Sequence, residues 1–168
     1  GSLDGQHGPG LTWQVAGVSV DFPEGAESEV SGEGTLTGSW DATRLSGQVR
    51  IEKMLYDKAV ELTDLMPWFK RSVSRGKSRR ASARKLQLDL RVLAPGELFI
   101  DNNIARVEMS ADLRVRGDTA KVELSGPIEV IEGEVLFNDN RFVLTKGVIQ
   151  FRPERGVNPT LNISAEAV

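Results

Sequence analysis

The chain has 168 residues, of which 39% are hydrophobic and 6% aromatic, and it contains 17 glycines and no cysteine. Its length suits a single domain, and its composition is lean for a compact globule that fills its interior with large side chains. The lack of cysteine excludes a disulfide framework and a thiolate zinc site. No segment approaches the roughly 18 apolar residues of a membrane-spanning helix, and the first residues do not have the pattern of a signal peptide.

The net charge of −3 conceals an uneven distribution. Eight basic residues and no acidic residue lie between Lys70 and Lys85, which leaves 13 basic against 24 acidic residues, a balance of −11, in the rest of the chain. This segment is either a solvated flexible loop, a contact for anionic lipid head groups or a contact for nucleic acid. Its Ser, Ala and Gly filler favours the loop, and Trp68 and Phe69 just before it favour a membrane interface over nucleic acid. The residues expected to contact head groups are Arg75, Lys77, Arg79 and Arg80.

Groups that could support catalysis are scarce. The only histidine, His7, lies in the glycine-rich residues 1–10, which we expect to be a disordered lead-in that includes a tag remnant. Its position argues against a Ser-His-Asp triad and a histidine-based metal site. Carboxylates such as Glu108 and Asp112 fall at outward positions of predicted strands, where they are solvated, so a paired-carboxylate hydrolase is disfavoured. We expect neither enzymatic activity nor a cofactor.

From residue 11 onward most of the chain has the alternation of β-strands. Residues 11–15 alternate, and Gly17 shifts the phase before residues 18–22, as a β-bulge would. The segment PEGAESE at residues 23–29 is predicted to be a turn. Residues 30–40 place glycines between their apolar residues, and another group must fill these gaps unless the strand bends there.

One helix is predicted, followed directly by the basic segment. Leu62, Leu65, Met66 and Phe69 have the i, i+3, i+4, i+7 spacing of a helical apolar face. Together, residues 61–85 are therefore expected to form a short amphipathic helix and a basic flexible loop.

The later strands are the most regular. Residues 86–92 alternate cleanly, and the APG of residues 94–96 is predicted to turn the chain. The segment VEMSADLRV at residues 107–115 alternates without interruption and forms a long, thin apolar face. The segments DNN at 101–103 and FNDNRF at 137–142 are predicted to be tight turns, the latter a hairpin, because Asn and Asp tolerate left-handed geometry.

One glycine-led unit recurs. A glycine is followed at i+2 and i+4 by large apolar residues at 47–51, 126–130, 133–137 and 147–151. Each glycine is predicted to allow a tight turn or bend at a strand entrance, and the two apolar residues of each unit share a face. The pattern predicts an up-and-down sheet with short connections.

A resemblance to a known family is carried by LRVLAPGELFIDNNIARVEMSADLRVRGD, LSGPIEVIEGEVLFNDNRFVLTKGVIQF and NPTLNISAEA. The order of a leucine-alternating strand, a proline turn, IDNN, glycine-led strands, G-x-I-x-F and P-x-L-x-I resembles the TamB C-terminal domain, in the AsmA-like and chorein-like group. The resemblance covers residues 86–168. Residues 11–60 match only in style, and the basic segment has no counterpart.

The resemblance implies an all-β fold in which residues 11–168 form one elongated antiparallel sheet, folded into an open trough, a β-taco, with an apolar interior. It implies a periplasmic part of an inner-membrane-anchored protein of Gram-negative bacteria, which conducts phospholipid between the two membranes and supports outer-membrane protein assembly. The implied partner is a TamA-like outer-membrane barrel of the Omp85 family with POTRA domains. Phospholipid is the implied cargo, with no nucleic acid.

Apolar strand residues of one parity are expected to line the trough. They are Leu86, Leu88, Leu90, Val107, Met109, Ala111, Leu113, Val115, Ile128, Val130, Val135, Phe137, Phe142, Leu144, Ile149, Phe151, Leu161 and Ile163. Two alternatives remain open. One is a chaperone-like or scaffold module that docks an Omp85-family partner or an unfolded outer-membrane protein by β-strand addition. The other is a structural β-sandwich with a closed core.

Overall fold

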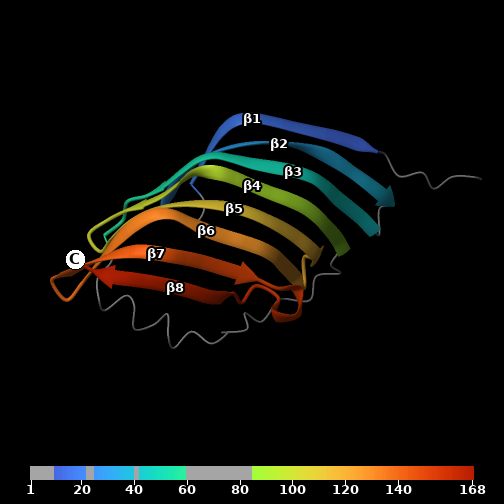
Figure 1. The fold of residues 1–168 in the computed structure, drawn as a ribbon. Coiled ribbons are helices and arrows are strands. Elements are labelled where there is room, and N and C mark those ends of the chain that lie inside the picture. The colour runs from blue at the N-terminus through green and yellow to red at the C-terminus, as the bar shows by residue number, and fades with distance from the viewer. Residues whose placement is uncertain (1–9, 22–24, 40–41, 60–84) are drawn as a thin grey trace, which may run out of the picture.

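The computed structural model describes residues 10–21, 25–39, 42–59 and 85–168. Eight strands form a single open sheet in which they lie side by side in chain order, as Figure 1 shows. In the described part of the chain, the only helix is the single 3₁₀ turn η1 (Pro153–Arg155). The all-β prediction is therefore confirmed, and the one-sheet arrangement contradicts the β-sandwich alternative.

The strands are long, from 8 residues in the last to 17 in the fourth. They are β1 (Leu11–Asp21), β2 (Ala26–Ser39), β3 (Ala42–Tyr56), β4 (Lys85–Asp101), β5 (Ala105–Asp118), β6 (Val122–Phe137), β7 (Asn140–Phe151) and β8 (Thr160–Ala167).

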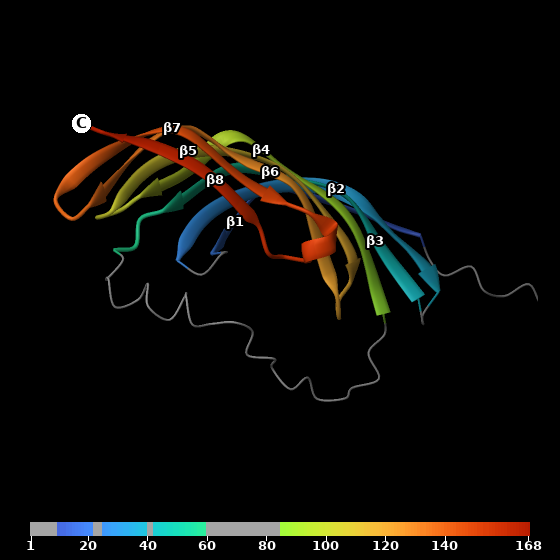
Figure 2. The ribbon, with the colours of Figure 1, turned by 60° about the horizontal axis from the view of Figure 1, so that its bottom comes forward.

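The sheet is curved into an open trough. In Figures 1 and 2 the strands bow in the same sense, so that the sheet arches instead of lying flat. Ala94, Leu98, Val107, Met109 and Ala111, on β4 and β5, form a buried cluster. Apolar side chains from β3, β6 and β7 pack against this cluster. Convergence of side chains from five strands indicates that they lie on the concave side, so the trough prediction is confirmed.

One strand pair differs from the predicted antiparallel sheet. β3 and β4 are parallel, with Ala42 opposite Lys85 and Tyr56 opposite Ile100, whereas the other neighbouring strands are antiparallel. Parallel neighbours need a long connection because the chain must return to the end of the sheet where it started. The prediction that all connections are short is therefore wrong for the connection between β3 and β4. The predicted helix and nearly all of the basic segment lie at residues 60–84, outside the described residues.

One predicted turn lies inside a strand, and another overlaps the start of a strand. The APG of residues 94–96 lies inside β4, where the register with β5 shifts between Ala94 and Leu98 and Glu97 has a φ of 61°. Pro95 cannot donate to the ladder, and a bulge tolerates it without ending the strand. The predicted turn at 23–29 is also too long, because β2 already begins at Ala26.

The other local predictions agree with the structure. Asn138 and Asp139 have φ values of 51° and 62° and join β6 to β7 in a two-residue hairpin. The side-chain oxygen of Asn102 accepts hydrogen bonds from the backbone N–H groups of Ile104 and Ala105 at 3.1 and 3.0 Å, which closes the β4–β5 turn. Gly17 has a φ of 57° at the register shift of β1.

The glycine-led units occupy strand interiors instead of strand entrances. The first lies within β3, two lie within β6, and the fourth lies within β7. Their apolar residues at i+2 and i+4 do share a face, because residues two apart in one strand point to the same side of the sheet. The glycines therefore mark the interior of this face.

Candidate functional site

One face of the sheet is apolar across all eight strands. Residues opposite each other in neighbouring strands share a face, as do residues two apart in a strand. Starting from Val107 on β5, the register leads through Ile100 on β4 and Tyr56 on β3 to Ala26 on β2. In the other direction, Ala111 leads through Ile128 and Ile149 to Leu161 on β8. This side of the sheet is called the apolar face below.

All 18 residues expected to line the trough lie on the apolar face, according to the strand register. Their burial differs strongly. Val107 is 7% exposed, whereas Phe137, Leu161 and Ile163 are 66%, 61% and 52% exposed. The centre of the face is therefore covered, and its margin at β6 and β8 is open to solvent.

The first three strands extend this face beyond the predicted set. The additional apolar residues are Leu11, Trp13, Val15, Val18, Val20, Val30, Leu36, Leu45, Val49, Ile51 and Met54. The expected resemblance was placed on residues 86–168, so it did not identify these residues. Their alternation was nevertheless visible in the sequence, and the missing information was the parallel pairing of β3 with β4.

Neighbouring side chains cover glycines of the apolar face. A Cβ atom on Gly133 would lie 2.9 Å from Cγ2 of Val107, and one on Gly147 would overlap the side chain of Val130. On β2 and β3, the indole ring of Trp13 lies over Gly34 and Gly47. The gaps expected at these glycines are therefore filled by side chains of the chain itself, and each glycine permits close contact with a neighbouring strand.

The opposite face is mostly polar and carries ion pairs between strands, and Leu55, Phe99 and Val143 are apolar exceptions on it. Arg91 on β4 donates from Nε and Nη2 to the two carboxylate oxygens of Asp112 on β5, at 3.1 and 2.9 Å. Asp89 lies 3.2 Å from Nε of Arg114 and 3.5 Å from Nε of Arg116. The hydrogen bonds from Arg91 lower the pKa of Asp112, and the hydrogen bond from Arg114 lowers that of Asp89. This face is called the polar face.

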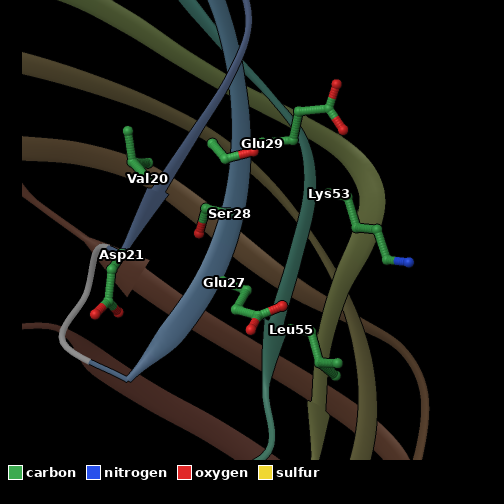
Figure 3. Close-up of a pocket in the computed structure, with 8 residues that line it drawn as sticks. Val20, Asp21, Glu27, Ser28, Glu29, Lys53 and Leu55 are labelled. Atoms are coloured by element: carbon green, nitrogen blue, oxygen red, sulfur yellow. The ribbon is translucent and has the colours of Figure 1, made fainter.

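A pocket of about 440 Å³ lies where β1, β2 and β3 meet at one end of the sheet. Figure 3 shows Asp21 from β1, Glu27 and Glu29 from β2, and Lys53 and Leu55 from β3 around it. Asp21 accepts a hydrogen bond from the backbone N–H of Gly25 at 3.1 Å. Half of its eight lining residues are charged, and Glu27, Glu29 and Lys53 lie on the polar face, so the pocket is not a continuation of the apolar face. Within the described ranges, no group of three or more His, Cys, Asp or Glu side chains is placed to hold a metal ion.

Among the described strands, β1 and β8 each pair with one neighbour only, so they form the two edges of the sheet. All eight residues of β8 are exposed, and every residue of β1 except Trp13 is exposed. β8 contains neither proline nor a basic residue, which are common devices that keep an edge strand from pairing with another chain. The edge at β8 is therefore chemically suited to accept a further strand.

A single-layer trough with one apolar face, one ion-paired polar face and open edges defines a class of β-sheet proteins without a closed core. The chain belongs to the TamB C-terminal domain family, whose sequence model matches residues 4–168. Among curated proteins, no sequence matches this chain. The helices of the described part include none that is long and apolar enough to cross a membrane.

Proposed function

We propose that this chain is a periplasmic lipid-binding and lipid-conducting module of a TamB-like protein. In this role it moves phospholipid between the inner and outer membranes and supports outer-membrane protein assembly, without an enzymatic step. The observation that carries the proposal is the apolar face, which continues across all eight strands of a single sheet. Membership of the TamB family supports the periplasmic setting.

Exposed apolar area gives the trough its affinity for acyl chains. Phe137, Leu161 and Ile163 are each more than half exposed on this face. Contiguous exposed apolar surface is unfavourable in water and commonly marks a binding site. Covering it gains about 25 cal/mol per Å² of apolar surface removed from water. An elongated acyl chain suits such a face because it needs apolar contact along its length and few directional hydrogen bonds.

Lipid extraction tests the binding step. The protein is purified from bacteria without detergent, and its organic extract is analysed by mass spectrometry, beside a control protein of similar size. Phospholipid is expected in the wild-type extract. Ile163→Glu places a charge on the apolar face of β8 and should reduce the amount of bound lipid. Ser164→Glu is the control, because it places the same charge at the next residue of β8, on the polar face, and should leave the amount of bound lipid unchanged.

Two results would count against binding in the trough. The first is equal lipid in the Ile163→Glu and Ser164→Glu proteins. The second is a lipid-free wild-type extract combined with no uptake from added liposomes.

A charge in the middle of the trough tests conduction. Leu113 lies on β5, opposite Val92 of β4 and beside the buried cluster. Leu113→Glu should block the passage of acyl chains while the far-ultraviolet circular dichroism of the sheet persists. The measurement is phospholipid transfer between donor and acceptor liposomes, together with co-purified lipid. Unchanged transfer and lipid content would remove Leu113 from the lining.

The open edge of β8 favours a second function, which is docking by β-strand addition. All eight residues of β8 are exposed. A TamA-like barrel of the Omp85 family, through its POTRA domains, or an unfolded outer-membrane strand would then pair with this edge through backbone hydrogen bonds. Lipid binding would be incidental to this role.

Proline substitutions distinguish edge docking from lipid binding. The N–H groups of consecutive strand residues point to opposite edges, so of Asn162→Pro and Ile163→Pro one removes a donor to β7 and the other a donor to the free edge. The variant that removes the donor to the free edge should keep its thermal stability and lose binding to a TamA-like POTRA fragment. If both variants bind that fragment as wild type does, pairing at this edge is untenable.

A further inference from the structure

Trp13 has an environment unlike that of any other residue in β1. The remaining residues of the strand are exposed, and Trp13 alone is half-buried. Its indole ring reaches across β2 to β3. A Cβ atom would lie 2.7 Å from Cζ2 of the ring if built on Gly34, 2.8 Å if built on Gly47, and 3.1 Å from Cζ3 if built on Gly32. These three glycines are called the glycine bed, and Trp13 is its cover.

The nitrogen of this indole ring is enclosed and unpaired. An indole N–H can only donate a hydrogen bond. Nε1 of Trp13 has almost no exposed surface and no hydrogen-bond partner in the described part of the chain. On the same face, Leu11 precedes Trp13 by two residues, and Leu36 on β2 and Leu45 on β3 lie in register with Leu11. Buried indole N–H groups usually have a partner, so the covered state gains ring packing and leaves one donor unsatisfied.

We propose that Trp13 is a ligand-displaced cover, and that its N–H donates to the ester carbonyl of an acyl chain that takes its place on the glycine bed. This inference rests on the proposed lipid-binding function and deepens it, because it assigns the polar end of the ligand to one place in the trough. β1 is an edge strand held on one side only, so the ring can move without opening the sheet.

The chemistry of the ligand matches both parts of the site. The methylene chain next to an ester is slender and apolar, and it fits against glycine backbone that offers no side chains. The ester carbonyl accepts a hydrogen bond and donates none, so it complements a group that only donates. A phosphate oxygen of the same lipid is also an acceptor, and the probes below separate the two sources.

The test compares two soluble probes, below their micellar concentrations. One is a lysophosphatidylcholine with an ester-linked chain, and the other is its ether-linked analogue, which keeps the phosphate and lacks the carbonyl. The affinity of the full chain for each is measured by calorimetry. Wild type should bind the ester about fivefold to tenfold more tightly, the effect of one hydrogen bond. Trp13→Phe keeps a ring over the glycine bed without the donor, and should bind both probes with equal affinity.

Each outcome is informative, because failure of the inference differs from failure of the proposed function. If wild type binds neither probe, the lipid-binding proposal fails, and this inference fails with it. If wild type binds both probes equally, or if Trp13→Phe keeps the preference for the ester, only the inference is overturned. The comparison within wild type does not depend on the folding of any variant.

Fluorescence provides a second measurement on the same residue. In a Trp40→Phe/Trp68→Phe background, Trp13 is the only tryptophan. The ester probe should shift its emission to longer wavelength as the buried, unpaired N–H forms a hydrogen bond, and the ether probe should shift it less. Identical shifts with the two probes would contradict donation to the carbonyl.

Discussion

Ion pairs on the polar face tie β4 to β5 through single side chains. Asp112 receives two hydrogen bonds from Arg91, and Asp89 lies between Arg114 and Arg116. The pKa values of both carboxyl groups are lowered in the folded protein, chiefly by hydrogen bonds from Arg91 and Arg114 respectively. A carboxyl group whose folded pKa is lowered stabilises the protein at pH values above its unfolded pKa, and this contribution is lost as the pH falls through the folded value.

We therefore expect Asp112→Asn to lower the melting temperature by a few degrees at pH 7, and by less as the pH falls below about 4. The pairs are exposed, so the effect is small, and it should shrink further in 1 M salt. Thermal unfolding of wild type and Asp112→Asn at pH 7 and at pH 2.5 checks this. A difference between the two proteins that did not change with pH would show that the ion pair is not its cause.

For single residues, the sequence predicted which side chains share a face, because alternation along a strand determines the face to which each side chain points. It did not predict what covers the glycines. Gly133 and Gly147 contact Val107 and Val130, which belong to neighbouring strands and approach only once the register is set. The position of Trp13 over the glycine bed has the same origin. The pattern showed gaps in the face, and only the structure shows what fills them.

Among the elements, β4 contains a bulge with a strained residue. Glu97 is exposed and has a φ of 61°, in the left-handed region that costs a residue with a side chain about 1 kcal/mol or more. Glu97→Gly should therefore raise the free energy of unfolding by about 1 kcal/mol, because glycine adopts this conformation without strain. Urea denaturation followed by circular dichroism measures the change.

The same substitution at a strand residue without a positive φ is the control. Glu129 on β6 is exposed, lies opposite Ser110 and is not among the residues with a positive φ. Glu129→Gly should lower the free energy of unfolding by about 0.5–1 kcal/mol, since glycine loses more backbone freedom on folding. Changes of the same sign in the two variants would show that Glu97 is not strained.

The residues of this bulge are the ones for which a turn was predicted in β4. Ala, Pro and Gly in succession normally punctuate a chain. Here both flanks pair with β5, Ala94 with Ala111 and Leu98 with Met109, so the strand resumes after the irregularity. Such pairing joins residues far apart in sequence, and local turn propensity does not contain it. The hairpin at Asn138 and Asp139 was predictable because there the turn residues alone set the geometry.

For the whole molecule, the parallel β3–β4 pair joins two antiparallel groups of strands into one sheet. β1, β2 and β3 form the first group, and β4 to β8 form the second. The sequence predicted each group from its own alternation and short turns, but the direction of one group relative to the other depends on how the intervening residues return. The pairing makes the apolar face continuous, since Leu45, Gly47 and Val49 lie opposite Leu88, Leu90 and Val92.

A sheet with a buried centre and open edges should not be equally stable throughout. Local opening costs least where few apolar contacts hold a strand, and amide hydrogen exchange measures that cost. The buried cluster lies on β4 and β5, whereas β8 is wholly exposed. We therefore expect exchange to be slowest in β4 and β5 and to become faster toward β1 and β8.

Phospholipid should slow amide exchange at the edge of the sheet and leave exchange at its centre unchanged. If acyl chains lie along the trough, they cover the exposed residues Leu161 and Ile163 on β8, and exchange in β8 should slow when liposomes are added. β4 and β5 are already protected and should change little. Leu113→Glu with the same liposomes is the control, and it should lose the slowing while keeping the gradient measured without lipid. If amide exchange in β8 is still slowed by liposomes in this variant, the liposomes protect the β8 edge from outside the trough. That result would favour the edge of the sheet, and not the apolar face, as the lipid-binding surface.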